Sequence, residues 1–175
     1  NPGLIIAKMN SLCHDEIIEE LYKASNAGVR VMLNIRGICT LIPGVKGMSE
    51  NIEVSSVVGR YLEHSRVFYF KNGGSEDLYL SSADWMVRNL DKRIELMFPV
   101  RDKDAFREVK DVLMLYFKDN THCHRLLKNG SWKAVTPAAG EQTVSVQEEL
   151  QQKYARRDEA RKSQPQLEFV VRRKN

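Results

Sequence analysis

The chain has 175 residues, of which 42% are hydrophobic and 29% are charged, as is typical of one globular domain. No apolar run approaches the roughly 20 residues that a membrane-spanning helix requires. The net charge of +4 is concentrated at the C-terminal end, where residues 153–175 contain eight Lys or Arg and three Asp or Glu. The remainder is close to neutral and lacks the basic surface expected of a nucleic-acid-binding core.

The first predicted unit is a strand, a helix and a second strand. Residues 4–9 are mostly apolar and predict a buried strand. Apolar residues then recur at helical spacing within residues 14–26, at Ile17, Ile18, Leu21 and Tyr22. Residues 29–35 predict another buried strand. A strand–helix–strand unit of this length predicts two parallel strands with a right-handed crossover, and hence an α/β fold.

The middle of the chain is predicted to contain a loop, a helix and a hairpin. Residues 37–51 are punctuated by Pro43-Gly44, and an irregular loop of this length in a compact domain is usually functional or mobile. Valines and a tyrosine at helical spacing predict a helix over residues 52–62. Two apolar strands over residues 66–70 and 78–81, joined by a Gly-rich turn, predict a β-hairpin.

The C-terminal part is predicted to contain a strand over residues 93–100, a helix over 102–117, a short strand over 132–135 and a polar helix over 146–162. We expect a mixed β-sheet flanked by helices over residues 1–135. Residues 136–175 are expected to form a linker, the polar helix and a basic tail. The chain starts with Asn1-Pro2-Gly3 without an initiator Met or a signal peptide, so we expect it to begin at a domain boundary within a longer protein.

Arg36 is the first candidate for chemistry, because it follows the second predicted strand directly. In open α/β sheets, ligands bind at the carboxyl ends of the strands. A guanidinium group at that position, followed by Gly37, suits a phosphate ligand, since Arg forms paired, permanently charged hydrogen bonds with phosphate oxygens. The alternative is a structural salt bridge at a strand end.

His64 is the second candidate, because imidazole exchanges protons near neutral pH. It lies two residues before Arg66, at the start of the predicted hairpin. Residues i and i+2 of a strand point to the same side, so we expect the two side chains to share a face. A His–Arg pair suits a phosphate that offsets their mutual repulsion, and a histidine that only caps the strand is the alternative.

Ser82 and Asp84 follow the hairpin, where a hydroxyl and a carboxylate could orient a nearby His or Arg. Alternatively, Asp84 caps the next turn. The run His122-Cys123-His124 suggests a metal site, but no second Cys/His pair stands at a suitable spacing, so we predict none. Neither a Walker-type loop nor a nucleophile elbow is present. The three cysteines are widely spaced, which favours a reducing cytosol over a disulfide framework.

At these positions the sequence resembles the last domain of polyphosphate kinases that work through a phosphohistidine. The resemblance is strong from residue 1 to about residue 117 and looser beyond. The runs that carry it are Ala7-Lys8-Met9-Asn10-Ser11-Leu12, Arg36-Gly37-Ile38-Cys39, Ser49-Glu50-Asn51-Ile52, Leu62-Glu63-His64-Ser65-Arg66, Phe68-Tyr69-Phe70, Asn72-Gly73-Gly74, Ser81-Ser82-Ala83-Asp84-Trp85-Met86 and Arg88-Asn89-Leu90-Asp91.

The resemblance implies a phospholipase-D-like fold and reversible transfer of the terminal phosphate of ATP to inorganic polyphosphate. The phosphorylated histidine would lie on an upstream domain of the same chain, so we expect the isolated fragment to be inactive. Mg²⁺ is implied as a cofactor with its ligands outside this chain. The partners implied are ATP or ADP, polyphosphate and the upstream domains, in a cytoplasmic homo-oligomer with peripheral membrane association and without nucleic acid.

The resemblance also assigns roles to individual residues. His64 corresponds to the family's second essential histidine and Arg36 to an arginine that contacts ATP. His64-Ser65-Arg66 stands where phospholipase-D-like enzymes have His-x-Lys, whereas Lys71 occupies the position of that motif's acidic residue. Arg66 is expected to hold phosphate beside Arg36, and Ser82 and Asp84 to support these residues.

Two other functions remain open on the sequence. A phospholipase-D-like phosphodiesterase would keep the fold, although such enzymes usually need two His-x-Lys motifs and this chain has one imperfect copy. A non-enzymatic polyanion-binding module would instead use the cations of the tail: Arg156, Arg157, Arg161, Lys162, Arg172 and Arg173.

Overall fold

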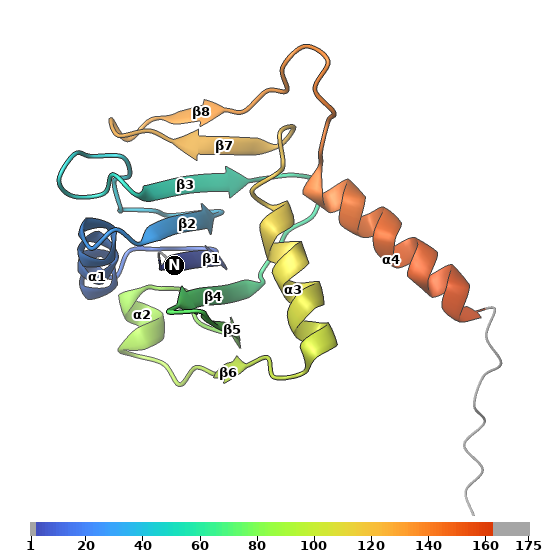
Figure 1. Cartoon of the computed structure of the whole chain (residues 1–175), viewed down its shortest axis with the longest axis horizontal. Helices are drawn as coiled ribbons and strands as arrows, with labels where there is room; N and C mark the ends of the chain where they lie inside the picture. Colours follow the sequence, from blue (N-terminus) through green and yellow to red (C-terminus); the bar gives the residue numbers. More distant parts are fainter. Residues whose placement is uncertain (1–2, 163–175) are drawn as a thin grey trace, which may run out of the picture.

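The structure, a computed structural model, describes residues 3–162, and Arg172 and Arg173 of the predicted tail lie outside the described residues. A single mixed sheet forms the centre of the domain (Figure 1). Its strands are β1 (Leu4–Met9), β2 (Arg30–Ile35), β3 (Ile52–Val57), β4 (Arg66–Asn72), β5 (Ser75–Ser81), β6 (Met97–Pro99), β7 (Cys123–Leu126) and β8 (Trp132–Ala134). The helices are α1 (Asp15–Asn26), α2 (Val87–Leu90), α3 (Lys103–Leu115) and α4 (Val146–Lys162).

The strand order is β6-β5-β4-β1-β2-β3-β7-β8, with the predicted parallel pair β1–β2 at the centre. β3 extends the parallel part beside β2, whereas β4 runs antiparallel to β1 on the other side. β4 and β5 form the predicted hairpin, in full register from Arg66↔Ser81 to Asn72↔Ser75. The expected α/β fold with a mixed sheet flanked by helices is confirmed.

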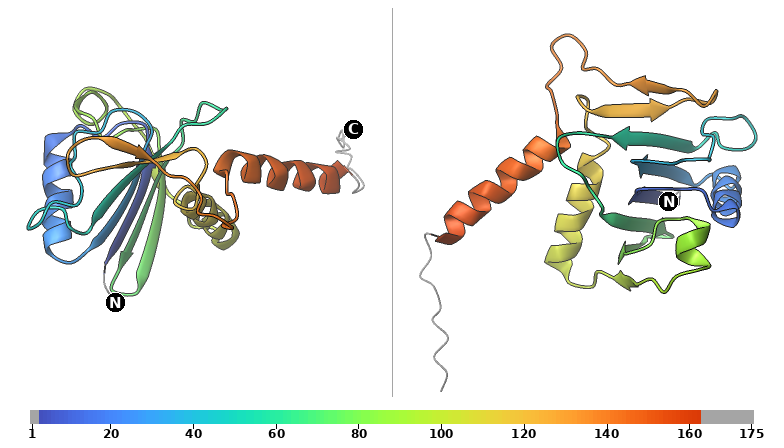
Figure 2. Two further views of the ribbon diagram at one scale, coloured as in Figure 1. Left: turned by 90° about the horizontal axis from the view of Figure 1, so that it is seen from above. Right: turned by 180° about the vertical axis from the view of Figure 1, so that it is seen from behind.

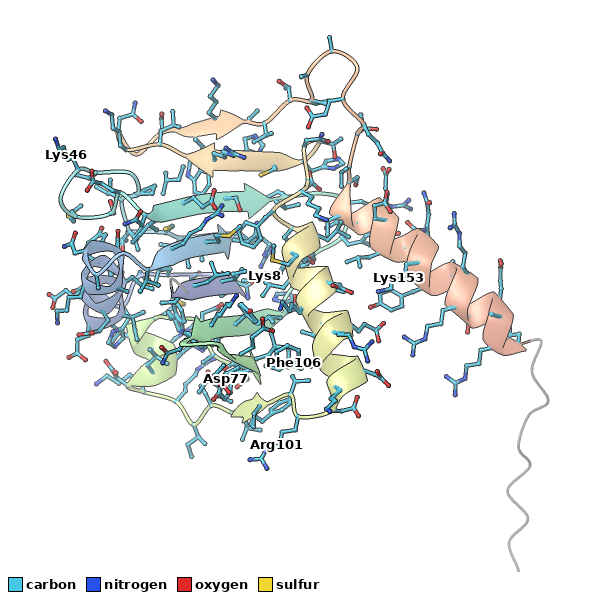
Figure 3. All side chains as sticks on the ribbon, viewed as in Figure 1. Lys8, Lys46, Asp77, Arg101, Phe106 and Lys153 are labelled. Carbon is cyan, nitrogen blue, oxygen red and sulfur yellow. The ribbon has the colours of Figure 1, made fainter. Side chains whose placement is uncertain are left out.

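The two faces of the sheet are covered by different helices, as the view along the sheet shows (Figure 2). Because side chains alternate along a strand, β1 sends Ala7 and Met9 into the core shared with α1 and sends Ile6 into the core shared with α3. Ile18 and Leu21 of α1 fill the first core, and Leu113 of α3 fills the second. Lys8 lies on the α3 side, with its ammonium nitrogen 4.7 Å from the ring centre of Tyr116 (Figure 3).

The predicted helix over residues 52–62 is wrong, because residues 52–57 form strand β3. Val54 and Val57 of the predicted helical face are β-branched, which favours a strand, and pairing with β2 and β7 on both sides decides the conformation. The strand expected over residues 93–100 is restricted to Met97–Pro99. Strand β7 was not predicted.

The chain beyond residue 135 takes part in the folded core. Val146, the first residue of α4, is fully buried and packs with Val57, Tyr116 and Cys123. The buried carboxylate of Asp119 accepts a hydrogen bond from the Val146 backbone N–H at 2.9 Å. From Gln151 onward α4 is exposed and extends away from the sheet (Figure 2). Within residues 3–162, no helix is long and apolar enough to cross a membrane.

Candidate functional site

The predicted site residues gather at one edge of the sheet. β1 and β2 end there, at Met9 and Ile35, and the antiparallel strand β4 begins there at Arg66. β5 runs antiparallel to β4, so it also ends at this edge. The segments that follow β1, β2 and β5 therefore meet the segment that precedes β4, and they carry Asn10, Arg36, His64, Arg66, Ser82 and Asp84.

Arg36 is held by Asn10 at the ends of the two central strands. Its Nε donates to Oδ1 of Asn10 at 3.1 Å. The backbones also approach closely, since the Gly37 N–H donates to the Asn10 carbonyl at 2.8 Å and a Cβ at Gly37 would lie 3.0 Å from that oxygen. Within the described residues the terminal guanidinium nitrogens of Arg36 have no partner. Arg36 therefore offers two nitrogens to an anion.

Asp84 links this region to Arg66. Its carboxylate accepts two hydrogen bonds from Arg66, from Nε at 3.1 Å and from Nη2 at 3.0 Å, and a third from the Asn10 backbone N–H at 2.7 Å. Asp84 is 6% exposed. Burial opposes ionisation of this carboxyl, but the hydrogen bonds from Arg66 and Asn10 together hold its pKa below the ordinary value. Asp84 is thus a buried carboxylate that orients Arg66.

His64 lies in the exposed segment that leads into β4. Its ring has no hydrogen-bond partner within the described residues, whereas its backbone carbonyl accepts a hydrogen bond from Nη1 of Arg66 at 2.7 Å. The Arg66 side chain thus contacts Asp84 and the backbone of residue 64, and no contact with the His64 ring is present in this part of the structure. His64 and Arg66 thus lie at the same edge of the sheet, although their side chains are not hydrogen-bonded to each other in the described structure.

Ser82 makes different contacts from those expected. Its hydroxyl donates to the Glu95 carboxylate, and it accepts a hydrogen bond from the Leu96 backbone N–H at 2.9 Å. Asn89 also donates to Glu95. Ser82 thus fastens the segment before β6 to the end of β5, and in the described structure its hydroxyl has no hydrogen bond with Arg36, His64 or Arg66.

The described residues contain no group of three or more His, Cys, Asp or Glu side chains placed to hold a metal ion. At the predicted edge, Asp84 is already engaged by Arg66 and Asn10. In the run His122-Cys123-His124, the His122 ring lies 3.0 Å from the Thr121 hydroxyl, and burial raises the pKa of the Cys123 thiol to about 11. These side chains do not fit a Mg²⁺ site, which requires free oxygen ligands.

Sequence reasoning missed two contributors to this edge. Asn10 joins Arg36 to Asp84, and its position directly after β1 is the same signal that singled out Arg36. Glu63 lies beside His64 and bonds to Tyr116, Lys8 and Gln147. No local signal indicates this contact, because Gln147 is 84 residues away in the sequence.

The mixed sheet with helices on both faces is a phospholipase-D-like α/β fold. NucT from Helicobacter pylori shares this fold, with a TM-score of 0.53 over 69% of this chain and 80% of that one at 13% identity. The chain belongs to the family of polyphosphate kinase C-terminal domains, since the model of "Polyphosphate kinase C-terminal domain 2" matches residues 1–147. This result confirms the resemblance, and the match extends past residue 117.

Individual relatives support the same family. The polyphosphate kinase of Rhodopirellula baltica is 48% identical over 171 residues, which are 98% of this chain and 20% of that protein. The polyphosphate kinase of Pseudomonas aeruginosa is 50% identical over 154 residues, 88% of this chain and 22% of that protein. The crystal structure of polyphosphate kinase from Porphyromonas gingivalis matches with a TM-score of 0.85 and 39% identity, covering 91% of this chain and 24% of that one. The chain therefore spans about a fifth of the length of the curated relatives it matches.

Proposed function

We propose that this domain holds phosphate groups within a polyphosphate kinase, which transfers the terminal phosphate of ATP reversibly to inorganic polyphosphate. Arg36 and Arg66 bind phosphate oxygens. His64 faces a phosphohistidine carried by an upstream domain and acts as proton donor or electrostatic partner. Asp84 supports this arrangement by its direct contact with Arg66. Ser82 supports it by fixing the segment before β6 through Glu95.

The observation that carries the proposal is the connection Arg36–Asn10–Asp84–Arg66 at the sheet edge. Transfer of a phosphoryl group depends mainly on positioning and on stabilising charge in the transition state. Asp84 balances the charge of Arg66, whereas Arg36 has no acidic partner within the described residues. An unbalanced guanidinium at the same edge of the sheet as an exposed imidazole is suited to a polyanionic chain.

The remaining components belong to the whole enzyme. ATP or ADP and polyphosphate are its substrates, upstream domains supply the phosphohistidine and the Mg²⁺ ligands, and the chain assembles as a homo-oligomer. Such an enzyme would act in the cytoplasm, with peripheral association at the membrane and no nucleic-acid partner. This proposal also implies that the domain alone binds phosphate without turning over ATP.

Binding of ATP and of short-chain polyphosphate to the chain, measured by calorimetry at two salt concentrations, tests this proposal. Arg36→Ala should weaken binding by about tenfold or more, because one charged bidentate contact contributes roughly 1.5–3 kcal/mol. Arg30→Ala is the matched control, since Arg30 starts the same strand at the opposite edge and pairs with Glu53. Unchanged affinity in Arg36→Ala and His64→Ala, together with loss of binding at the higher salt concentration, would contradict a phosphate site at this edge.

A further inference from the structure

The segment that carries His64 is irregular and yet firmly attached. Residues 58–65 connect β3 to β4 without regular secondary structure, and Val58, Tyr61 and Leu62 are exposed. Glu63 is the exception, because its side chain is only 16% exposed. A single inward-pointing carboxylate therefore stands directly before the candidate catalytic histidine.

Glu63 is bound from three separate elements. Lys8 of β1 places its ammonium nitrogen 3.3 Å from Oε2 of Glu63, and the Tyr116 hydroxyl, after α3, donates to the same oxygen. Gln147 of α4 donates from Nε2 to Oε1 at 2.7 Å. Lys8 also donates to the Ser65 carbonyl at 3.4 Å, so the residues on both sides of His64 are held.

Gln147 contributes most of this attachment. Its amide pairs with the Tyr61 backbone, accepting from the N–H at 2.8 Å and donating to the carbonyl at 2.8 Å. Together with the bond to Glu63, both amide hydrogens and the amide oxygen are used. Gly59 leaves room for this side chain, since a Cβ there would lie 2.6 Å from Oε1 of Gln147. Gln147 is 8% exposed, so its amide group is largely withdrawn from water.

We propose that Glu63 and Gln147 are positioning residues, which fix the segment 59–65 so that His64 is presented at the phosphate-binding edge. Neither side chain hydrogen-bonds to Arg36 or Arg66 within the described residues, since Glu63 is engaged by Lys8, Tyr116 and Gln147, and Gln147 by Glu63 and the Tyr61 backbone. The positioning role rests on the function proposed for His64, whereas the ordering of the segment does not depend on it. Misplacement of a reacting group by about 1 Å can reduce a rate by about 100-fold.

The ordering is tested first in the 175-residue chain, by ¹⁵N relaxation of the backbone amides of residues 61–65. The wild-type amide of His64 should have an order parameter near 0.85, and Gln147→Ala should lower it below about 0.6. Tyr116→Phe, which keeps the ring over Lys8, should lower it in the same direction. Gln152→Ala, an exposed glutamine of the same helix, is the matched control and should change nothing. An unchanged order parameter in both Gln147→Ala and Tyr116→Phe would overturn the proposal.

The catalytic consequence is measured in the full-length kinase. Gln147→Ala should lower kcat by about 10-fold to 100-fold with a much smaller effect on the KM for ATP, because Arg36, the proposed ATP contact, is held by Asn10 and not by this segment. Gln152→Ala should retain wild-type kinetics. Wild-type kcat in Gln147→Ala, in an enzyme that His64→Ala inactivates, would refute positioning. Full activity of His64→Ala would instead refute the function proposed for the site and leave the relaxation result standing.

Discussion

Asn10 connects the two arginines of the sheet edge through different atoms. Its side-chain oxygen accepts from Arg36, and its backbone N–H donates to Asp84, which in turn orients Arg66. Arg66 uses Nε and Nη2 on Asp84 and Nη1 on the His64 carbonyl. Two of its five guanidinium N–H groups therefore remain for the proposed phosphate contact, whereas four remain on Arg36.

Asp84→Asn should flatten the acid dependence of stability. The pKa of Asp84 is lowered in the folded chain, so its ionised form adds stability above the unfolded value of about 3.9, and this is lost as pH falls through the folded pKa. Between about pH 4 and pH 2, the free energy of unfolding should therefore fall more steeply for the wild type than for Asp84→Asn. Asp77→Asn, at an exposed site on β5, is the control for urea unfolding across this range. Parallel curves for wild type and Asp84→Asn would disprove the coupling.

Local sequence patterns predicted most of the helices and strands, and they failed where pairing between strands determines the conformation. α4 begins and extends as its sequence indicates, and the β1–α1–β2 unit follows from apolar spacing. β3 was misassigned because Val54 and Val57 fit a helical face as well as a strand, and only its neighbours β2 and β7 select the strand. Arg36 was predicted because it directly follows a buried strand, and Asn10 carries the same signal because it directly follows β1. The contact of Gln147 with Glu63 is tertiary and left no local pattern.

Removing residues 153–175 should leave the domain folded and still able to bind polyphosphate. Within the described residues, this deletion removes exposed ion pairs such as Arg157–Glu108, and such pairs contribute about 0–1 kcal/mol. Val146→Ala, at the buried start of α4, should instead cost roughly 2 kcal/mol. Urea unfolding and polyphosphate binding compare the two variants. Loss of binding on deletion alone would favour a polyanion-binding module that uses the basic tail.

The whole molecule presents an open edge rather than an enclosed active site. His64 is exposed, and Arg36 follows the carboxyl end of β2 at the same edge of the sheet. The chain spans about a fifth of the curated polyphosphate kinases it matches. Water must be excluded from a phosphoryl-transfer site for its charges to act strongly. Under the proposed function, an upstream part of the enzyme would therefore close over this edge during turnover.

The role proposed for His64 is tested by measuring phosphohistidine formation from ATP in the full-length enzyme carrying His64→Gln. Labelling from [γ-³²P]ATP should be abolished, because the imidazole proposed to face the phosphohistidine is replaced by an amide that cannot act as a proton donor or acceptor near neutral pH. His124→Gln, at an exposed histidine of β7 far along the sheet order from β4, should label normally. Labelling and turnover at the wild-type rate in His64→Gln would contradict the account.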